Sequence, residues 1–180
     1  MLEKDILKVL VSKEEIKEIA IKLGKQVTED YKDTQPLVIG LLNGCVPFIG
    51  VLLGEIDLYL DIAFMDVSSY HGGTQTTGEV KILMDLQIPV TDRDIIIVED
   101  IVDSGRTLKL VTELLYFRGA KSVKVVTLLD KPEGREVEFV PEYIGVTIPK
   151  EFVVGFGLDY EDKYRNLPYV GVLKPEVYNK

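Results

Sequence analysis

The chain has 180 residues, enough for one domain with a sizeable core, and its 46% hydrophobic and 28% charged residues are typical of a globular protein. The net charge of −9 argues against nucleic acid or an anionic membrane as the main partner, but it is compatible with a polyphosphate ligand if Mg²⁺ and backbone amides neutralise that ligand. The single cysteine, Cys45, excludes an internal disulfide, and the N-terminus lacks a signal-peptide pattern, so we expect a cytoplasmic protein.

The chain opens with a strand and a helix in the predicted order of elements. Clustered aliphatic residues over 5–11 favour a short edge strand. Ser12 and Glu15 form the pattern of a capping box, and apolar residues then recur at helical spacing to about Tyr31. We therefore expect one amphipathic helix that starts directly after the first strand.

An uncharged run over 37–54 has the length of a transmembrane segment, which makes it the one stretch that suggests a membrane protein. Asn43-Gly44 and Pro47 interrupt this run, however, and such residues punctuate structure strongly. A buried strand over 37–42, a turn and a helix over 47–55 explain the pattern better than a membrane span does.

The next predicted strand covers 58–64, where apolar and polar residues alternate. Residues 67–79 then form a segment rich in Ser, Gly and Thr, followed by a short strand over 80–83. The segment is either a mobile surface loop or a lid that closes over an active site and excludes water, and its length favours the lid. Ser69 and Tyr70 are the candidate lid residues.

The most informative stretch is 95–108, which begins with four consecutive apolar residues. This pattern predicts a central parallel strand that is buried on both faces. Two adjacent carboxylates, Glu99 and Asp100, follow near its carboxyl end, and a turn of small polar residues over 103–107 leads into a helix over 108–118. An anion site at a helix N-terminus therefore lies beside a pair of hydrogen-bond acceptors.

The rest of the chain continues the alternation of strands with other segments. A buried strand is expected over 122–129, with Asp130-Lys131-Pro132 at its carboxyl end, and a further strand over 143–148. An aromatic and glycine-rich segment over 151–160 follows, and a last strand over 169–173 is expected to close the sheet. The order of elements predicts a parallel α/β sheet.

The central stretch suggests a particular ligand. Loop amides and a helix N-terminus suit a phosphate, whereas two carboxylates accept hydrogen bonds from a vicinal diol. A 5-phosphorylated ribose carries both groups. The stretch resembles the phosphoribosyl-pyrophosphate (PRPP) motif of type I phosphoribosyltransferases. The alternative is an ordinary strand, loop and helix with a solvated carboxylate pair.

Beyond this motif, nearly the whole chain resembles the bacterial hypoxanthine-guanine phosphoribosyltransferases. The resemblance implies one domain over 1–180, with a central, mostly parallel sheet flanked by helices as a core over about 12–145, and a small hood from 1–11 and 146–180. The matching segments are Leu42-Asn43-Gly44, Ser69-Tyr70, Glu99 to Thr107, Leu128 to Pro132, Phe152 to Gly155, and Asp159-Tyr160 to Arg165.

The same resemblance implies roles for individual residues. The groups that contact PRPP and its phosphates would be Asn43, Gly44, Glu99, Asp100, Asp103, Ser104, Gly105, Arg106, Thr107 and Arg165. Mg²⁺ would be held by Glu99, Asp100 and Asp159, in the last case through water. The purine would contact Lys131 at its 6-oxo group, Phe152 by stacking, the Val153 backbone, and Asp159. Asp103 would be the catalytic general base at purine N7.

The implied activity is purine salvage, in which a PRPP-derived phosphoribosyl group is transferred to hypoxanthine or guanine, with xanthine as a further candidate, by a homodimer or homotetramer. One departure concerns Asn43, where many members have Lys; relatives also often have a cis peptide at the place of Leu42–Asn43. Two alternatives remain: an enzyme of the same fold with an adenine or pyrimidine acceptor, which Lys131 and Phe152 argue against, and a PRPP-binding regulator of nucleic acid binding, which the net charge argues against.

Overall fold

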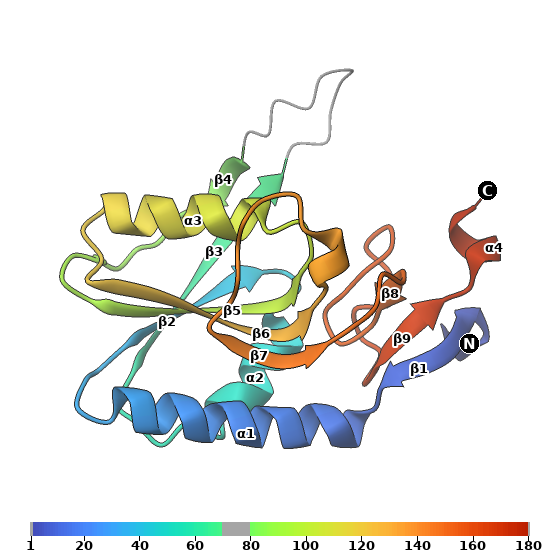
Figure 1. The fold of residues 1–180 in the computed structure, drawn as a ribbon, viewed down its shortest axis with the longest axis horizontal. Coiled ribbons are helices and arrows are strands. Elements are labelled where there is room, and N and C mark those ends of the chain that lie inside the picture. The colour runs from blue at the N-terminus through green and yellow to red at the C-terminus, as the bar shows by residue number, and fades with distance from the viewer. Residues whose placement is uncertain (1, 70–79, 180) are drawn as a thin grey trace.

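The computed structural model describes residues 2–69 and 80–179 (Figure 1). The strands are β1 (Ile6–Val11), β2 (Leu37–Leu42), β3 (Asp61–Ser69), β4 (Val80–Met84), β5 (Asp94–Val102), β6 (Ser122–Asp130), β7 (Tyr143–Thr147), β8 (Val153–Val154) and β9 (Val170–Leu173). The helices are α1 (Lys13–Tyr31), α2 (Val46–Leu53), α3 (Arg106–Phe117) and α4 (Pro175–Tyr178), with short 3-10 turns η1 (Leu2–Asp5) and η2 (Pro132–Gly134).

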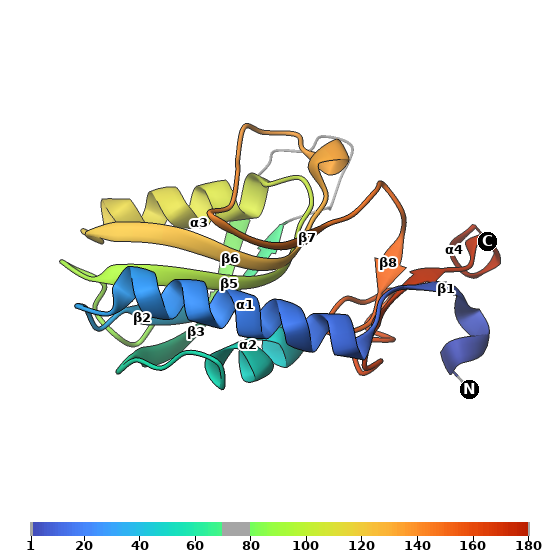
Figure 2. The same cartoon turned by 60° about the horizontal axis from the view of Figure 1, so that its bottom comes forward.

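A six-stranded sheet in the order β4-β3-β2-β5-β6-β7 forms the centre of the molecule. All neighbouring pairs are parallel except β3 and β4, so the predicted mostly parallel sheet is confirmed. The helices α1 and α2 cover one face and α3 covers the other, as Figures 1 and 2 show. Helices on both faces explain why the apolar run of β5, Ile95 to Val98, is fully buried.

The helix α1 begins where the sequence predicts. Ser12 Oγ accepts a hydrogen bond from the Glu15 amide at 3.2 Å, and Glu15 Oε2 accepts one from the Ser12 amide at 2.8 Å. The capping box is therefore complete. Ile16, Leu23 and Val27 on the inner face of the helix are buried in the core cluster shared with α2 and β5.

A second, three-stranded sheet in the order β1-β9-β8 is built from the two ends of the chain. The expectation that the last strand closes the central sheet is wrong. Instead, β9 pairs antiparallel with β1 and with β8, and it lies beyond the end of α1 in both overall views (Figures 1 and 2). The side chains of β9 are apolar on both faces, so their pattern fits either sheet and does not distinguish the two.

The expected strand over 58–64 has different bounds in the structure. Its parallel pairing with β2 starts at Asp61, and β3 then continues to Ser69. Leu58 and Leu60 precede the strand and pack against the core as partly buried residues. The alternation of apolar residues in the sequence indicates which side chains are buried. The limits of the strand are set instead by its pairing with β2. None of the described helices is long and apolar enough to span a membrane.

Candidate active site

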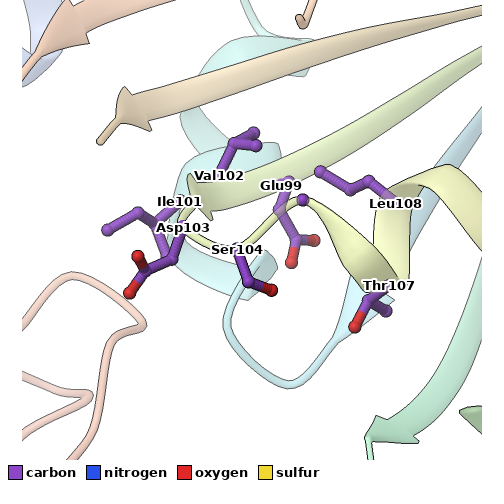
Figure 3. A pocket seen from close by; sticks show the side chains of 8 residues that line it. Glu99, Ile101, Val102, Asp103, Ser104, Thr107 and Leu108 are labelled. Atoms are coloured by element: carbon purple, nitrogen blue, oxygen red, sulfur yellow. The ribbon is translucent and has the colours of Figure 1, made fainter. Parts of the chain in front are cut away.

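The carboxyl end of β5 and the first turn of α3 bring together the predicted site residues of the central stretch (Figure 3). A hollow of about 120 Å³ opens at this place. It is lined by Glu99, Ile101, Val102, Asp103, Ser104, Gly105, Thr107 and Leu108. Ligands of open parallel sheets bind at this edge, because the strand ends and the helix N-termini meet there.

The turn between β5 and α3 has the geometry of an anion-binding loop. Gly105 lies immediately before α3 with φ of 79°, a left-handed conformation that glycine adopts without strain. The first amides of a helix have no acceptor within the helix, so the Thr107 amide can bind a ligand, while the Arg106 amide donates to Ser104 Oγ at 3.4 Å. Ser104 and Thr107 add hydroxyl groups to the lining of the hollow (Figure 3). Together these groups can hold a phosphate.

Solvent reaches the two adjacent carboxylates near the end of β5 to different extents, since Glu99 is half-buried and lines the hollow. Asp100 is buried, and burial raises its pKa to about 6, although the Ile101 amide and the Arg165 charge oppose the rise. Burial and the neighbouring Asp100 charge raise the pKa of Glu99 well above its ordinary value. Glu99 Oε2 is buried without a hydrogen-bond partner among the described residues. Among the described residues, Glu99 Oε2 therefore has no donor that would compensate the cost of its burial.

The turn after β2 approaches this pair closely. A β-carbon at Gly44 would collide with Asp100 Oδ2, so a side chain there would displace the Asp100 carboxylate. The Leu42–Asn43 peptide is cis, as the resemblance predicts. Gly157 lies against the Gly44 carbonyl with φ of 106°, and a β-carbon there would also collide. The turn, the carboxylate pair and the aromatic segment of the hood thus meet at one point.

Lys131 and Asp103 form an ion pair across the strand ends, with Lys131 Nζ 2.5 Å from Asp103 Oδ2. The Lys131 side chain is 12% exposed and that of Asp103 is 49% exposed. The backbone of Gly134 lies against the Asp103 carboxylate, and any side chain at Gly134 would displace it. A donor and an acceptor are therefore fixed side by side next to the phosphate loop, a contact that the sequence did not predict.

The hood contributes aromatic groups. Phe152, 40% exposed, stacks on Tyr178 with ring centroids 4.7 Å apart, and it meets Tyr160 edge to face at 5.7 Å. Val153 is buried in β8. The stacking of Tyr178 was not expected, because its partner lies 26 positions earlier in the chain and no local pattern links them.

Arg165 and Asp159 lie together and form an ion pair with each other. Arg165 Nη2 is 2.8 Å from Asp159 Oδ1, and Arg165 Nη1 donates to the Gly157 carbonyl at 2.8 Å. The other Asp159 oxygen accepts a hydrogen bond from the Asp162 amide at 2.9 Å. Both residues are therefore committed to the local structure of this loop.

Two expectations relate to other parts of the site. Ser69 is the last residue of β3, not part of a loop, and Tyr70 lies outside the described residues, so lid closure stays a prediction. Within 2–69 and 80–179, no group of three or more His, Cys, Asp or Glu side chains is placed to hold a metal ion by itself. No sequence pattern points to Arg135, which hydrogen-bonds to the Val102, Asp103 and Phe139 carbonyls and to Asp130.

Comparisons with known proteins agree with this geometry. The family model of the phosphoribosyl transferase domain matches residues 8–161. A hypoxanthine-guanine phosphoribosyltransferase of Lactococcus lactis subsp. lactis is 63% identical, covering 99% of this chain and 97% of its own. A protein of the same name from Streptococcus pyogenes serotype M3 is 56% identical over the whole of both chains. The crystal structure of a hypoxanthine phosphoribosyltransferase from Staphylococcus aureus has a TM-score of 0.95 at 49% identity, covering 99% of this chain and 97% of that chain.

The fold and the site define a type I phosphoribosyltransferase. Within that class, the chain belongs to the hypoxanthine-guanine phosphoribosyltransferase family.

Proposed function

We propose that this protein transfers the 5-phosphoribosyl group of PRPP to N9 of hypoxanthine or guanine in purine salvage, giving IMP or GMP and pyrophosphate. The observation that carries the proposal is the ion pair of Lys131 and Asp103, which sets a donor and an acceptor 2.5 Å apart at the mouth of the phosphate loop. Xanthine is a further candidate acceptor, because it carries the same 6-oxo group.

The ion pair matches one edge of a 6-oxopurine. Lys131 donates a hydrogen bond to O6, and Asp103 accepts one from the neighbouring N7–H. A 6-amino purine would set its own N–H donor against the Lys131 ammonium, so the pair selects against adenine. As N9 attacks the ribose, Asp103 accepts the proton from N7 and acts as the general base.

The phosphate loop and the carboxylate pair would hold the other substrate. The 5-phosphate binds to the loop amides of Ser104 to Thr107 and to the hydroxyls of Ser104 and Thr107. Glu99 and Asp100 accept hydrogen bonds from the ribose hydroxyls. Arg165 leaves Asp159 to donate to pyrophosphate, and the backbone amides of Asn43 and Gly44 contribute from the turn after β2.

The carboxylates also fit Mg²⁺. The unpartnered Glu99 Oε2 and the raised pKa of Asp100 indicate a place that favours a cation. Two carboxylates do not complete an octahedral site, but Mg²⁺ commonly takes one or two protein carboxylates together with water and substrate oxygens. Glu99 and Asp100 would hold one ion and Asp159 a second through water. When bound, Mg²⁺ neutralises the charge of the departing pyrophosphate.

The hood and the lid complete the site. Phe152 stacks on the purine ring, and the Val153 backbone binds the Watson–Crick edge of the purine. Closure of the segment that starts at Ser69 and Tyr70 excludes water, which protects PRPP from hydrolysis. The transition state resembles an oxocarbenium ion, as in other glycosyl substitutions.

We propose the cytoplasm as the place of action, without nucleic acid or membrane partners, and a homodimer or homotetramer as the working form. The buried free thiol of Cys45 suits a reducing compartment. Val46 and Val51 on α2, and Ile62 and Phe64 on β3, are exposed apolar residues that suit a contact between subunits.

A spectrophotometric assay tests the activity. Purified enzyme with PRPP and Mg²⁺ should convert hypoxanthine and guanine but not adenine or a pyrimidine base, and excess chelator should abolish turnover. Adenine turned over as fast as hypoxanthine would contradict the role of Lys131, and full activity in chelator would contradict the role of Mg²⁺.

A further inference from the structure

The loop after β6 crosses over the phosphate loop. Figures 1 and 2 show this segment, in orange, rising past the N-terminal end of α3. We call residues 131–139 the strap; it begins with Lys131 and contains η2. The strap bonds to the phosphate loop along its length, through the Lys131 amide to the Val102 carbonyl at 3.0 Å and through the Glu136 amide to the Ser104 carbonyl at 3.0 Å.

Arg135 is the residue of the strap with the most bonds to the site. Its Nη1 donates to the backbone carbonyls of Val102 at 2.5 Å and Asp103 at 2.6 Å. Its Nε donates to the Phe139 carbonyl at 3.0 Å, and its Nη2 pairs with Asp130 Oδ1. The Arg135 side chain is 15% exposed, so these bonds are largely shielded from water.

The groups that Arg135 contacts lie next to both members of the Lys131–Asp103 ion pair, which is proposed to bind the purine. Asp103 follows Val102 and accepts the Arg135 bond at its own backbone, while Asp130 immediately precedes Lys131. A guanidinium can satisfy acceptors in several directions within one plane, and an ammonium on a flexible stem cannot. Arg135 therefore links the backbone of Asp103, the proposed general base, to the residue that precedes Lys131, the proposed donor to purine O6.

We propose that Arg135 is a positioning residue, which fixes the spacing of Asp103 and Lys131 and so places the purine against the ribose. The inference rests on the roles proposed for those two residues. The groups that Arg135 contacts are backbone carbonyls and the Asp130 carboxylate, not the α3 amides to which the phosphate binds, so it should govern turnover more than PRPP affinity. A misplacement of reacting groups by about 1 Å can cost on the order of 10²-fold in rate.

The test variant is Arg135→Lys, which keeps a cation beside Asp130 and so avoids an unpaired buried carboxylate. We expect kcat to fall on the order of 10²-fold, with PRPP affinity changed only a few-fold, in protein that remains folded by circular dichroism. Arg135→Met combined with Asp130→Asn removes the ion pair altogether and should show the same split between kcat and PRPP affinity.

A matched control is Arg118→Lys. Arg118 also makes two hydrogen bonds to one carboxylate, Asp85, at 2.7 Å each, but it lies at the far end of α3. We expect its kcat to stay within about threefold of the unsubstituted enzyme, since distant substitutions act independently.

A double variant separates positioning from general stability. If Arg135 acts through Asp103, the loss in Arg135→Lys with Asp103→Asn should be smaller than the product of the single losses. A full product, or unchanged kcat in Arg135→Lys, would overturn the inference. If kcat is unchanged in the single variant Asp103→Asn, the general-base role of Asp103 is contradicted. That conclusion does not depend on the result for Arg135→Lys.

Discussion

At the scale of single residues, the adjacent carboxylates Glu99 and Asp100 place negative charge where the fold excludes water. Burial raises the pKa of Asp100 from 3.8 to about 6. Stability from this group is fully present below the unfolded pKa and is lost as pH rises through about 6. At neutral pH the charged carboxylate therefore costs the fold on the order of 3 kcal/mol, a strain that a bound cation would relieve.

Asp100→Asn should consequently raise the free energy of unfolding at neutral pH by up to about that amount in buffer without Mg²⁺, because the amide carries no charge. Urea unfolding at several pH values between about 4 and 8 measures the effect, and the difference from the unsubstituted protein should shrink as pH falls below about 6. The same substitution should weaken turnover, since the amide is a poorer partner for ribose and Mg²⁺.

Asp85→Asn is a control for which we expect the opposite change in the free energy of unfolding. The Arg118 hydrogen bond lowers the pKa of Asp85, so its stability contribution is present above the unfolded pKa and is lost only as pH falls. This variant should be slightly less stable at neutral pH. An Asp100→Asn protein that is also less stable at neutral pH would contradict the prediction, because the Ile101 amide and the Arg165 charge would then outweigh the cost of burying the Asp100 charge.

At the scale of elements, the start of α1 depends on a local device. Ser12→Ala removes the acceptor for the Glu15 amide and should cost about 1 kcal/mol, or roughly 2–4 °C in Tm for a chain of this size. Thermal unfolding followed by circular dichroism measures the loss. Ser12→Asn keeps a capping oxygen and should retain most of the stability, and equal losses in the two variants would show that capping is not the cause.

Elements of this kind could be predicted because their signals are local. The capping box sets the start of α1, Gly119 with φ of 89° ends α3, and the continuous apolar run of β5 marks a strand buried on both faces. The phosphate loop was equally local, because its residues are consecutive and their types suit an anion.

At the scale of the whole molecule, the missed features depend on pairings between distant parts of the chain. Nothing within β9 specifies that it pairs with β1, since that register joins Ile6 to Leu173. Arg135 looks like any charged residue of a polar loop until the fold sets it beneath the backbone of Asp103. The ion pair of Lys131 with Asp103 likewise joins the ends of two strands whose adjacency is a property of the sheet.

The central claim is that Lys131 and Asp103 hydrogen-bond to one edge of the purine, at O6 and N7, and that Asp103 accepts the proton from N7. Asp103→Asn keeps the size and hydrogen-bonding capacity of the side chain but cannot accept a proton. Asp92→Asn is a suitable control, because Asp92 lies in a turn at the amino end of β5 with φ of 59°, a conformation that Asn tolerates.

The most direct measurement is therefore kcat with hypoxanthine, together with PRPP affinity, for Asp103→Asn and the Asp92→Asn control. We predict that kcat of Asp103→Asn falls by about 10²–10⁴-fold, the usual contribution of a general base. PRPP affinity should change little, because the loop amides and the N-terminus of α3 remain in place, and the control should match the unsubstituted enzyme in both. Turnover of Asp103→Asn close to that of the unsubstituted enzyme would contradict the account.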